Sequence, residues 1–300
     1  MMKEEQNACS SVSAESWPPV HFGQSAEGFA VARVGDGAFA LLPGRSERFF
    51  VAYGSGISRP LSEWRRDDFY GATGDLVGED EFRAFVLDEA EHQRERRALG
   101  RRTMPSRIST PWGMSQDVTI YAEGIECHTT AEHGGFRLSP ERNAMVHPRW
   151  RSQGGWYEED CGWAIVAITF PELFTAQERR HAERTIKDIW PDEWEAAFDV
   201  VLGPGESVEK DRRRFHESHA SDWIVTAAIT SSHHPGTVEC VATLGGKRDP
   251  GMEERRFLVP KAEYEVGRFG FVINAERHQA CDGPSDFVAW GARAASRRAG

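Results

Sequence analysis

The chain has 300 residues, enough for about two domains at the usual size of roughly 150 residues each. Hydrophobic residues make up 39% and charged residues 28%, which is the balance of a globular protein. The formal net charge of −11 argues against a chain that coats nucleic acid without sequence preference, because such binding needs a basic surface. No apolar run approaches the roughly 18 residues of a membrane span, and the polar N-terminus has no secretion signal. We therefore expect a cytoplasmic protein that does not associate with a membrane.

The first 107 residues are predicted to hold a short lead and a small α+β segment. Residues 1–20 are rich in Ser, Glu and Gln, and we expect this lead to be disordered. A helix is predicted from Glu79 to about Leu99, because its apolar residues keep the helical period and Gly100 ends it. Within residues 21–107, apolar runs separated by Gly and Pro predict an antiparallel meander over 29–34, 38–42 and 49–53.

Arginines crowd the end of this helix and the linker after it, between Arg94 and Arg107. Basic residues at a helix C-terminus complement the helix dipole, which predicts a solvated helix end running into a linker. The alternative is a strip that contacts phosphate groups. This strip is the one part of the sequence that favours nucleic acid as a partner, and elsewhere such a partner is disfavoured.

Residues 108–203 are predicted to form a central domain in which strands precede helices. Ser139 and Pro140 are typical of a helix start, and Thr175 with Glu178 fits a capping box. Another helix is expected from Tyr157, with three acidic residues in its first turn, where negative charge suits the helix dipole. The expected strands lie at 118–121 and 125–130, and the expected helices begin at 140, 157, 176 and 191.

Residues 204–300 are predicted to be rich in β-structure. Strands are expected at 223–229, 238–244, 257–260 and 269–273, and a final helix at 286–298. The fold class is therefore α+β. It combines a small N-terminal antiparallel sheet with a helix, a middle segment in which strands are followed by helices, and a β-rich C-terminal segment.

His133 and the two glycines after it form the first candidate site, between a predicted strand and a predicted helix. A histidine in such a junction can act as a general base or a metal ligand. The backbone N–H groups of Gly134 and Gly135 can come close to a ligand because no side chain blocks them. His128 reaches the same point if the strand ends between the two histidines. The structural alternative is a turn histidine bonded to nearby backbone.

The second candidate cluster runs from Trp156 to Asp160. Neighbouring positions of a helix are about 100° apart, so at most one or two of its carboxylates face His133. Glu159 and Asp160 are the candidates, as an acid–base pair or as ligands of a hard cation, and Trp156 and Tyr157 would contact a ligand. The alternative is that the acids complement a helix dipole while the aromatic residues pack.

The sequence lacks the common signatures of phosphate loops, zinc proteases, esterases and deaminases. Its five cysteines do not have the spacing of a zinc ribbon or a redox motif, and we expect free thiols. The pattern assigns no cofactor and leaves the involvement of a metal open.

An ordered series of motifs in the middle of the chain resembles a known family. From Thr110 to Trp194 the chain is similar to an uncharacterised bacterial family of plasmid and phage proteins, the domain of unknown function seven thousand and seven. The resemblance implies no activity, only an accessory role in a bacterial cytoplasm. The motifs that carry it are Thr110–Gly113, Gly124–Ile125, His133–Phe136, Leu138–Asn143 and Gly154–Cys161.

Two functions are therefore expected, in order of preference. The first is an accessory protein of a mobile element that acts by binding a host or mobile-element protein, which suits the acidic charge balance and the Trp-rich middle segment. The second is a hydrolase-type enzyme, with or without a metal. In that enzyme His133 would be the base, Glu159 or Asp160 the acid or metal ligand, and Gly134 with Gly135 the anion-binding element.

Overall fold

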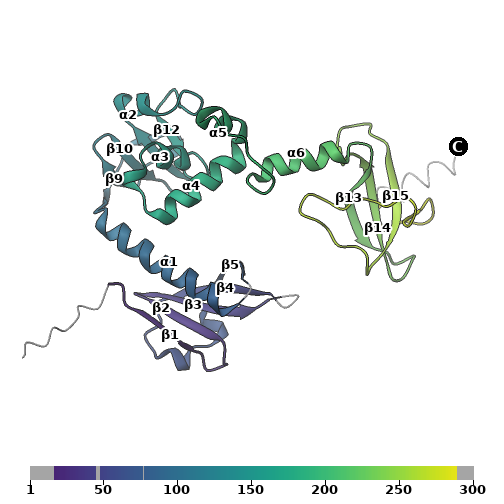
Figure 1. The fold of residues 1–300 in the computed structure, drawn as a ribbon, viewed down its shortest axis with the longest axis horizontal. Coiled ribbons are helices and arrows are strands. Elements are labelled where there is room, and N and C mark those ends of the chain that lie inside the picture. Colours follow the sequence, from purple (N-terminus) through teal and green to yellow (C-terminus); the bar gives the residue numbers. More distant parts are fainter. Residues whose placement is uncertain (1–16, 45–47, 77, 289–300) are drawn as a thin grey trace, which may run out of the picture. The chain divides into compact units, whose positions relative to one another are not determined.

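The computed structural model describes residues 17–44, 48–76 and 78–288 (Figure 1). The chain divides into two compact units, residues 1–185 and 186–300, and each is described by itself. Both combine antiparallel sheet with helix, which confirms the α+β class. The finer boundaries at residues 20, 107 and 203 stay predictions. Residues 1–16 of the expected lead, and the expected last helix beyond Val288, lie outside the described residues.

The N-terminal sheet is a five-stranded antiparallel meander with the order β1-β2-β3-β4-β5. Strands β2, β3 and β4 confirm the three strands predicted from apolar runs. The first and last strands were not predicted, because the sequences VHFGQ and GATGDL interrupt apolar residues with glycine and polar residues. The strands are β1 (Val20–Gln24), β2 (Ala30–Val34), β3 (Gly37–Pro43), β4 (Phe49–Ser55) and β5 (Gly71–Leu76).

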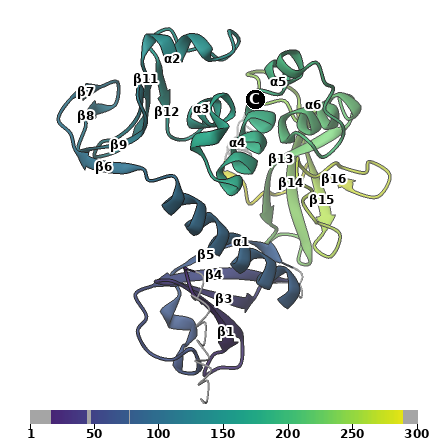
Figure 2. The same cartoon turned by 60° about the vertical axis from the view of Figure 1, so that its left-hand side comes forward.

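Helix α1 (Glu79–Ala98) covers one face of this sheet, as Figure 2 shows. Its apolar residues Phe82, Val86 and Ala90 are buried against side chains of β2, β3 and β4. The other face is filled by Trp64, which is fully buried and follows the short turn η1 (Leu61–Glu63), with η2 (Arg66–Asp68) after it. The sheet is thus apolar on both faces and forms the core of this part of unit 1.

The second sheet of unit 1, which we call the central sheet, has the order β12-β11-β10-β9-β6. A two-stranded ribbon, β7 with β8, lies between β6 and β9 in the sequence. The sheet strands are β6 (Arg102–Pro105), β9 (Asp117–Ala122), β10 (Ile125–Thr129), β11 (Gly134–Leu138) and β12 (Trp156–Glu158), and the ribbon strands are β7 (Ser109–Thr110) and β8 (Gly113–Met114). The helices of this region are α2 (Pro140–Met145), α3 (Trp163–Thr169), η3 (Pro171–Leu173) and α4 (Ala176–Ile189), which crosses into unit 2.

The predicted start of a helix at Tyr157 is wrong, although the helix itself forms further on and ends before Pro171. Residues Trp156–Glu158 form strand β12, which pairs with β11, and α3 begins only at Trp163. The Glu158 carboxylate accepts hydrogen bonds from the backbone N–H groups of the next turn, at Cys161 (2.7 Å) and Gly162 (3.1 Å). The acidic residue that was expected to begin a helix therefore caps a turn between a strand and a helix.

The predicted capping box at the start of α4 is confirmed. The Glu178 backbone N–H donates to Thr175 Oγ1 (3.1 Å), and the Thr175 N–H donates to Glu178 Oε2 (2.8 Å). The same carboxylate takes two hydrogen bonds from Arg101, at 2.8 and 2.6 Å. Arg101 is only 10% exposed, so this member of the arginine strip is not part of a solvated helix end.

Unit 2 contains α5 (Pro191–Phe198), α6 (Val208–Ser218) and a four-stranded sheet in the order β13-β14-β15-β16. The strand predicted at 269–273 is wrong, because this segment makes isolated bridges, from Val272 to Ile224 and from Gly270 to Gly267, in place of a continuous ladder. Gly270 has a φ of +142° there, which interrupts regular strand geometry. The strands of unit 2 are β13 (Trp223–Thr230), β14 (Thr237–Leu244), β15 (Glu254–Pro260) and β16 (Gln279–Ala280).

A buried ion pair joins two of these strands and anchors the segment after β16. Glu239 on β14 and Arg256 on β15 have side chains that are 1% and 3% exposed, with 2.7 Å between Oε1 and Nη1. Glu239 also accepts hydrogen bonds from the Ser285 hydroxyl and the Asp286 N–H. Among the helices in the described ranges, none combines the length and the apolar composition needed to cross a lipid bilayer.

Candidate functional site

A groove of about 910 Å³ lies beside the β7–β8 hairpin in unit 1. We call it the hairpin groove. One side is the hairpin with its flanking residues, and the other is the turn that follows β10. Its lining residues are Pro105–Arg107, Trp112–Gln116 and Thr130–Glu132.

Local hydrogen bonds hold the hairpin in this position. Thr110 Oγ1 donates to the Gly113 carbonyl (2.8 Å) and accepts from the Trp112 N–H (3.2 Å), which closes the tip. The Ser115 N–H donates to the Ile108 carbonyl at 2.9 Å, and the Gln116 N–H donates to the Thr129 carbonyl at 2.8 Å. The groove wall is therefore tied to both its own strands and the central sheet.

The indole of Trp112 packs on the backbone of Gly135 and meets Trp156 edge to face, with ring centroids 5.7 Å apart. A Cβ atom at position 135 would overlap the Trp112 ring and the carbonyl oxygen of Tyr157. A Cβ at Gly134 would lie 2.6 Å from the His128 carbonyl oxygen. Both glycines are required by the close approach of their neighbours, since neither has a positive φ.

His128 lies behind the groove rather than in it. Its side chain is 2% exposed, with Nδ1 at 3.1 Å from Ser115 Oγ and Nε2 at 3.4 Å from Glu126 Oε2. Ser115 lines the groove and is itself 1% exposed, so the imidazole supports the wall from inside. The ring centroids of Trp156 and His128 are 5.6 Å apart. His128 and Trp156, both predicted to contact a ligand, therefore lie in the layer that supports the groove wall.

His133 and Glu159 lie next to each other, with Nδ1 and Oε1 3.7 Å apart. Both side chains face solvent, at 58% and 43% exposed. The Thr130 hydroxyl donates to the His133 carbonyl, and the Glu159 N–H donates to the Gly134 carbonyl, which fixes the two backbones. The structure thus brings one histidine and one carboxylate of the predicted set together, at ion-pair distance.

The other two predicted residues lie elsewhere. The Asp160 N–H donates to the Glu158 carboxylate, and the Asp160 side chain is exposed. Tyr157 is 3% exposed, and its hydroxyl donates to Asn143 Oδ1 (2.6 Å) and accepts from the Ser152 N–H (3.1 Å). Burial raises the pKa of Tyr157 above its ordinary value. This tyrosine therefore holds the loop after α2, on the face of β12 opposite to Trp156.

The described residues contain no group of three or more His, Cys, Asp or Glu side chains arranged to hold a metal ion. Four cysteines lie in the described ranges, and all are free thiols. Burial raises the pKa of Cys127 to about 11, and burial together with the charges of Glu158 and Asp160 raises the pKa of Cys161. Neither thiol is activated as a nucleophile.

Sequence reasoning missed the groove residues Trp112, Met114, Ser115 and Thr130. Trp112 was noted only as one of several tryptophans expected to fill a core. The turn Thr110-Pro111-Trp112-Gly113 could have indicated this role for Trp112. An aromatic residue at the tip of a short hairpin has no partner within the hairpin and must pack against another segment.

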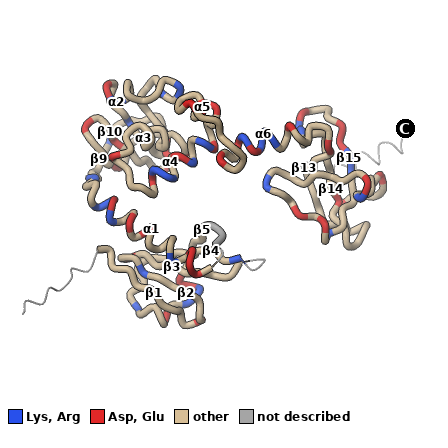
Figure 3. The backbone as a smooth tube through the Cα atoms, in the orientation of Figure 1, with Lys and Arg blue, Asp and Glu red and all other residues tan. Residues whose placement is uncertain are grey.

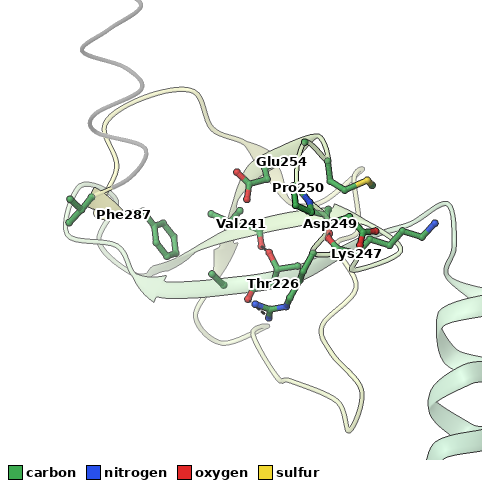
Figure 4. Close-up of a pocket in the computed structure, with 13 residues that line it drawn as sticks. Thr226, Val241, Lys247, Asp249, Pro250, Glu254 and Phe287 are labelled. Atoms are coloured by element: carbon green, nitrogen blue, oxygen red, sulfur yellow. Dashed lines mark hydrogen bonds between the residues drawn. The ribbon is translucent and has the colours of Figure 1, made fainter.

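Unit 2 has a separate groove of about 560 Å³ on the sheet face that carries Val241 and Thr243. Figure 4 shows Phe287 at one end of it and Lys247 with Asp249 at the other. Arg248 in its wall donates to the Thr226 carbonyl at 2.7 Å. Cationic and anionic side chains both line this groove, so its charge favours neither an anion nor a cation.

Comparison with known proteins finds a family match over part of the chain. Residues 105–220 match the model of DUF7007, a domain of unknown function. The DUF7007 match includes the hairpin groove, His133 and Glu159, and it extends past the end of α6 in unit 2. No curated protein and no solved structure matches the chain.

Proposed function

We propose that this protein works by binding a partner protein, and that the hairpin groove takes an extended segment of that partner. The observation that carries the proposal is an exposed apolar side chain in a well-defined groove. Met114 lines the groove and is 60% exposed, beside the half-buried Trp112. Methionine and tryptophan are both enriched at protein interfaces.

The polar lining of the groove suits a polypeptide better than a charged ligand. Arg107 and Glu132 bring one charge of each sign, and Gln116 and Thr130 add uncharged hydrogen-bonding groups. Such a mixture pairs with the backbone and polar side chains of a peptide, while the apolar residues take its anchors. The setting we propose is an accessory role for a mobile element in a bacterial cytoplasm, which rests on the family resemblance.

A displayed peptide library tests the groove directly. Peptides are selected on the wild-type chain, and their affinities are measured by fluorescence anisotropy. Met114→Glu places a charge in the groove and should weaken binding at least about tenfold. The matched control is Met145→Glu, because Met145 on α2 is also 60% exposed and does not line the groove. Equal affinities for the two variants would rule the groove out.

A second candidate function is a hydrolase-type enzyme, with or without a divalent cation, and the His133–Glu159 pair favours it. An imidazole next to a carboxylate is a common arrangement for general base catalysis. We would assay ester and phosphodiester substrates with and without added Mg²⁺, Mn²⁺ or Zn²⁺. Turnover that His133→Ala abolishes and Glu159→Gln reduces would support this function, and turnover unchanged in both variants would exclude it.

A further inference from the structure

A second pocket of unit 1 gathers arginines and aromatic residues, and it is separate from the hairpin groove. It has a volume of about 490 Å³ and lies between the last turns of α1 and two strands of the central sheet, the edge strand β6 and its neighbour β9. We call it the arginine pocket. Its lining residues are Trp17, Gln93, Arg96, Arg97, Arg101, Thr103, Thr119 and Tyr121.

Two of its arginines, Arg96 and Arg97, are exposed and free of ion pairs among the residues that the structure describes. Residues 94–107 contain six arginines and one acidic residue, Glu95. Figure 3 shows this basic colour at the end of α1 that leads into the central sheet. A local excess of guanidinium groups on an acidic chain favours an anionic ligand.

The third arginine gives the pocket a rigid wall. Arg101 is held by two hydrogen bonds to Glu178 and one to the Leu173 carbonyl (2.6 Å). Its guanidinium lies 4.1 Å from the centre of the Tyr121 ring. These contacts neutralise its charge and fix its position, so it shapes the pocket while Arg96 and Arg97 remain available to a ligand.

The pocket also offers hydrogen-bonding groups and an open aromatic ring. The hydroxyls of Thr103 and Thr119 lie 2.8 Å apart. Burial raises the pKa of Tyr121 to about 12, so its phenol keeps its proton near neutral pH. Trp17 is 46% exposed, although the Arg97 guanidinium lies 4.6 Å from the centre of its ring. An exposed indole beside arginines is a typical stacking surface for a nucleobase.

We propose that the arginine pocket binds a nucleoside phosphate, with Arg96 and Arg97 contacting the phosphate and Trp17 stacking on the base. The volume is that of a small-molecule site, which favours a mononucleotide over a long strand. This site is independent of the partner protein proposed for the hairpin groove, since none of its residues lines that groove.

Isothermal titration calorimetry on the full chain at low salt tests the proposal, with AMP, ATP and inorganic phosphate as probes. The wild type should bind a nucleotide at least about tenfold more tightly than phosphate, because stacking adds to the ionic contact. The double variant Arg96→Gln/Arg97→Gln should weaken nucleotide binding about tenfold or more. The matched control Arg94→Gln/Arg102→Gln removes the same charge from the same strip, outside the pocket, and should lose less than about threefold.

A further variant separates the base from the phosphate. Trp17→Ala should lower the affinity for AMP about fivefold and leave the affinity for inorganic phosphate unchanged. Trp17, Arg96, Arg97 and Arg102 are exposed, while Arg94 is half-buried and pairs with Glu91. Thermal unfolding followed by circular dichroism checks that each variant, the control included, keeps the wild-type fold.

Five results would overturn the proposal. Two of them are a wild type that binds neither AMP nor ATP, and an equal loss of affinity in the two double variants. Inorganic phosphate binding as tightly as AMP, or Trp17→Ala leaving AMP affinity unchanged, would remove the base contact. A short oligothymidylate that binds more than about tenfold tighter than a mononucleotide would mean a groove for a strand instead.

Discussion

Arg256 and Glu239 face each other inside the sheet of unit 2, with 2.7 Å between Nη1 and Oε1 and almost no solvent contact on either side chain. Arg256 Nη2 also donates to the Gly283 carbonyl, and Glu239 accepts from the Asp286 N–H at 3.1 Å. The pair therefore joins the strands to the segment after β16. Breaking it leaves a buried charge without its partner, which is among the costliest changes a protein can undergo.

Glu239→Ala should lower the free energy of unfolding by about 3–5 kcal/mol. The same change removes the acceptor for Ser285 and Asp286, so residues 283–288 should become accessible to proteases. Urea denaturation and limited proteolysis check the two effects. Glu253→Ala is the control, because Glu253 is exposed at 60% and its ion pair is with the exposed Arg255. A variant as stable as the control would contradict the structural role.

Glu178 should make the stability of unit 1 depend on pH. Burial raises the pKa of Glu178, but hydrogen bonds from Arg101 and the Thr175 N–H outweigh burial, and the net pKa is lowered. A lowered pKa in the folded state means that the stabilisation is present above the ordinary pKa of glutamate. It is lost as the pH falls through the folded-state value.

Glu178→Gln should therefore cost about 3 kcal/mol at neutral pH, and this cost should shrink as the pH falls through the folded-state pKa of Glu178, because the wild type then loses the same interaction. Urea denaturation of both proteins at pH 7 and at a series of lower pH values measures the difference. A cost that stays constant down to the pH at which the wild type unfolds would mean that the carboxylate is not the group responsible.

Gly135→Ala should destabilise unit 1 by about 2–3 kcal/mol, because the new methyl group overlaps the Trp112 ring and the Tyr157 carbonyl. Gly154→Ala is the matched control, since a Cβ there meets only ordinary contact at 3.6 Å from Trp156. Chemical denaturation compares them. Similar stabilities for the two variants would show that the contact between the Trp112 ring and Gly135 is less tight than the structure indicates.

His133→Ala should change the free energy of unfolding by less than about 0.5 kcal/mol, because exposed ion pairs contribute little. His128→Ala should cost about 2–3 kcal/mol, since it removes a buried ring and leaves Ser115 with one partner fewer. Thermal unfolding of both variants measures the contrast. A large loss with His133→Ala would mean that this residue is structural and would weaken any catalytic interpretation.

Local patterns were predictable from the sequence, and contacts between distant segments were not. The two partners of the capping box, Thr175 and Glu178, are three positions apart, so a short stretch of sequence reveals both. Strand β12 was mistaken for a helix because its acidic end suits a helix start. What decides its conformation is pairing with β11, for example Arg137 with Trp156.

The candidate site shows the same limit. The adjacency of His133 and Glu159 was expected from two clusters in one segment, and its chemistry stays a prediction. The groove wall was not expected, since Trp112 and Gly135 are far apart in the sequence and only the folded sheet brings them into contact. Arg101 was grouped with solvated arginines, because its partner Glu178 lies 77 residues away.

The Glu178 carboxylate accepts hydrogen bonds from Arg101, just after α1, and from the Thr175 N–H at the start of α4. It therefore links the two helix ends. Fraying of the first turn of α4 takes the acceptor away from Arg101, and release of Arg101 removes a partner from that turn. The two helix ends should consequently open together as one cooperative foldon. In native-state hydrogen exchange, the amides of Thr175 and Gly100 would then report a common opening free energy.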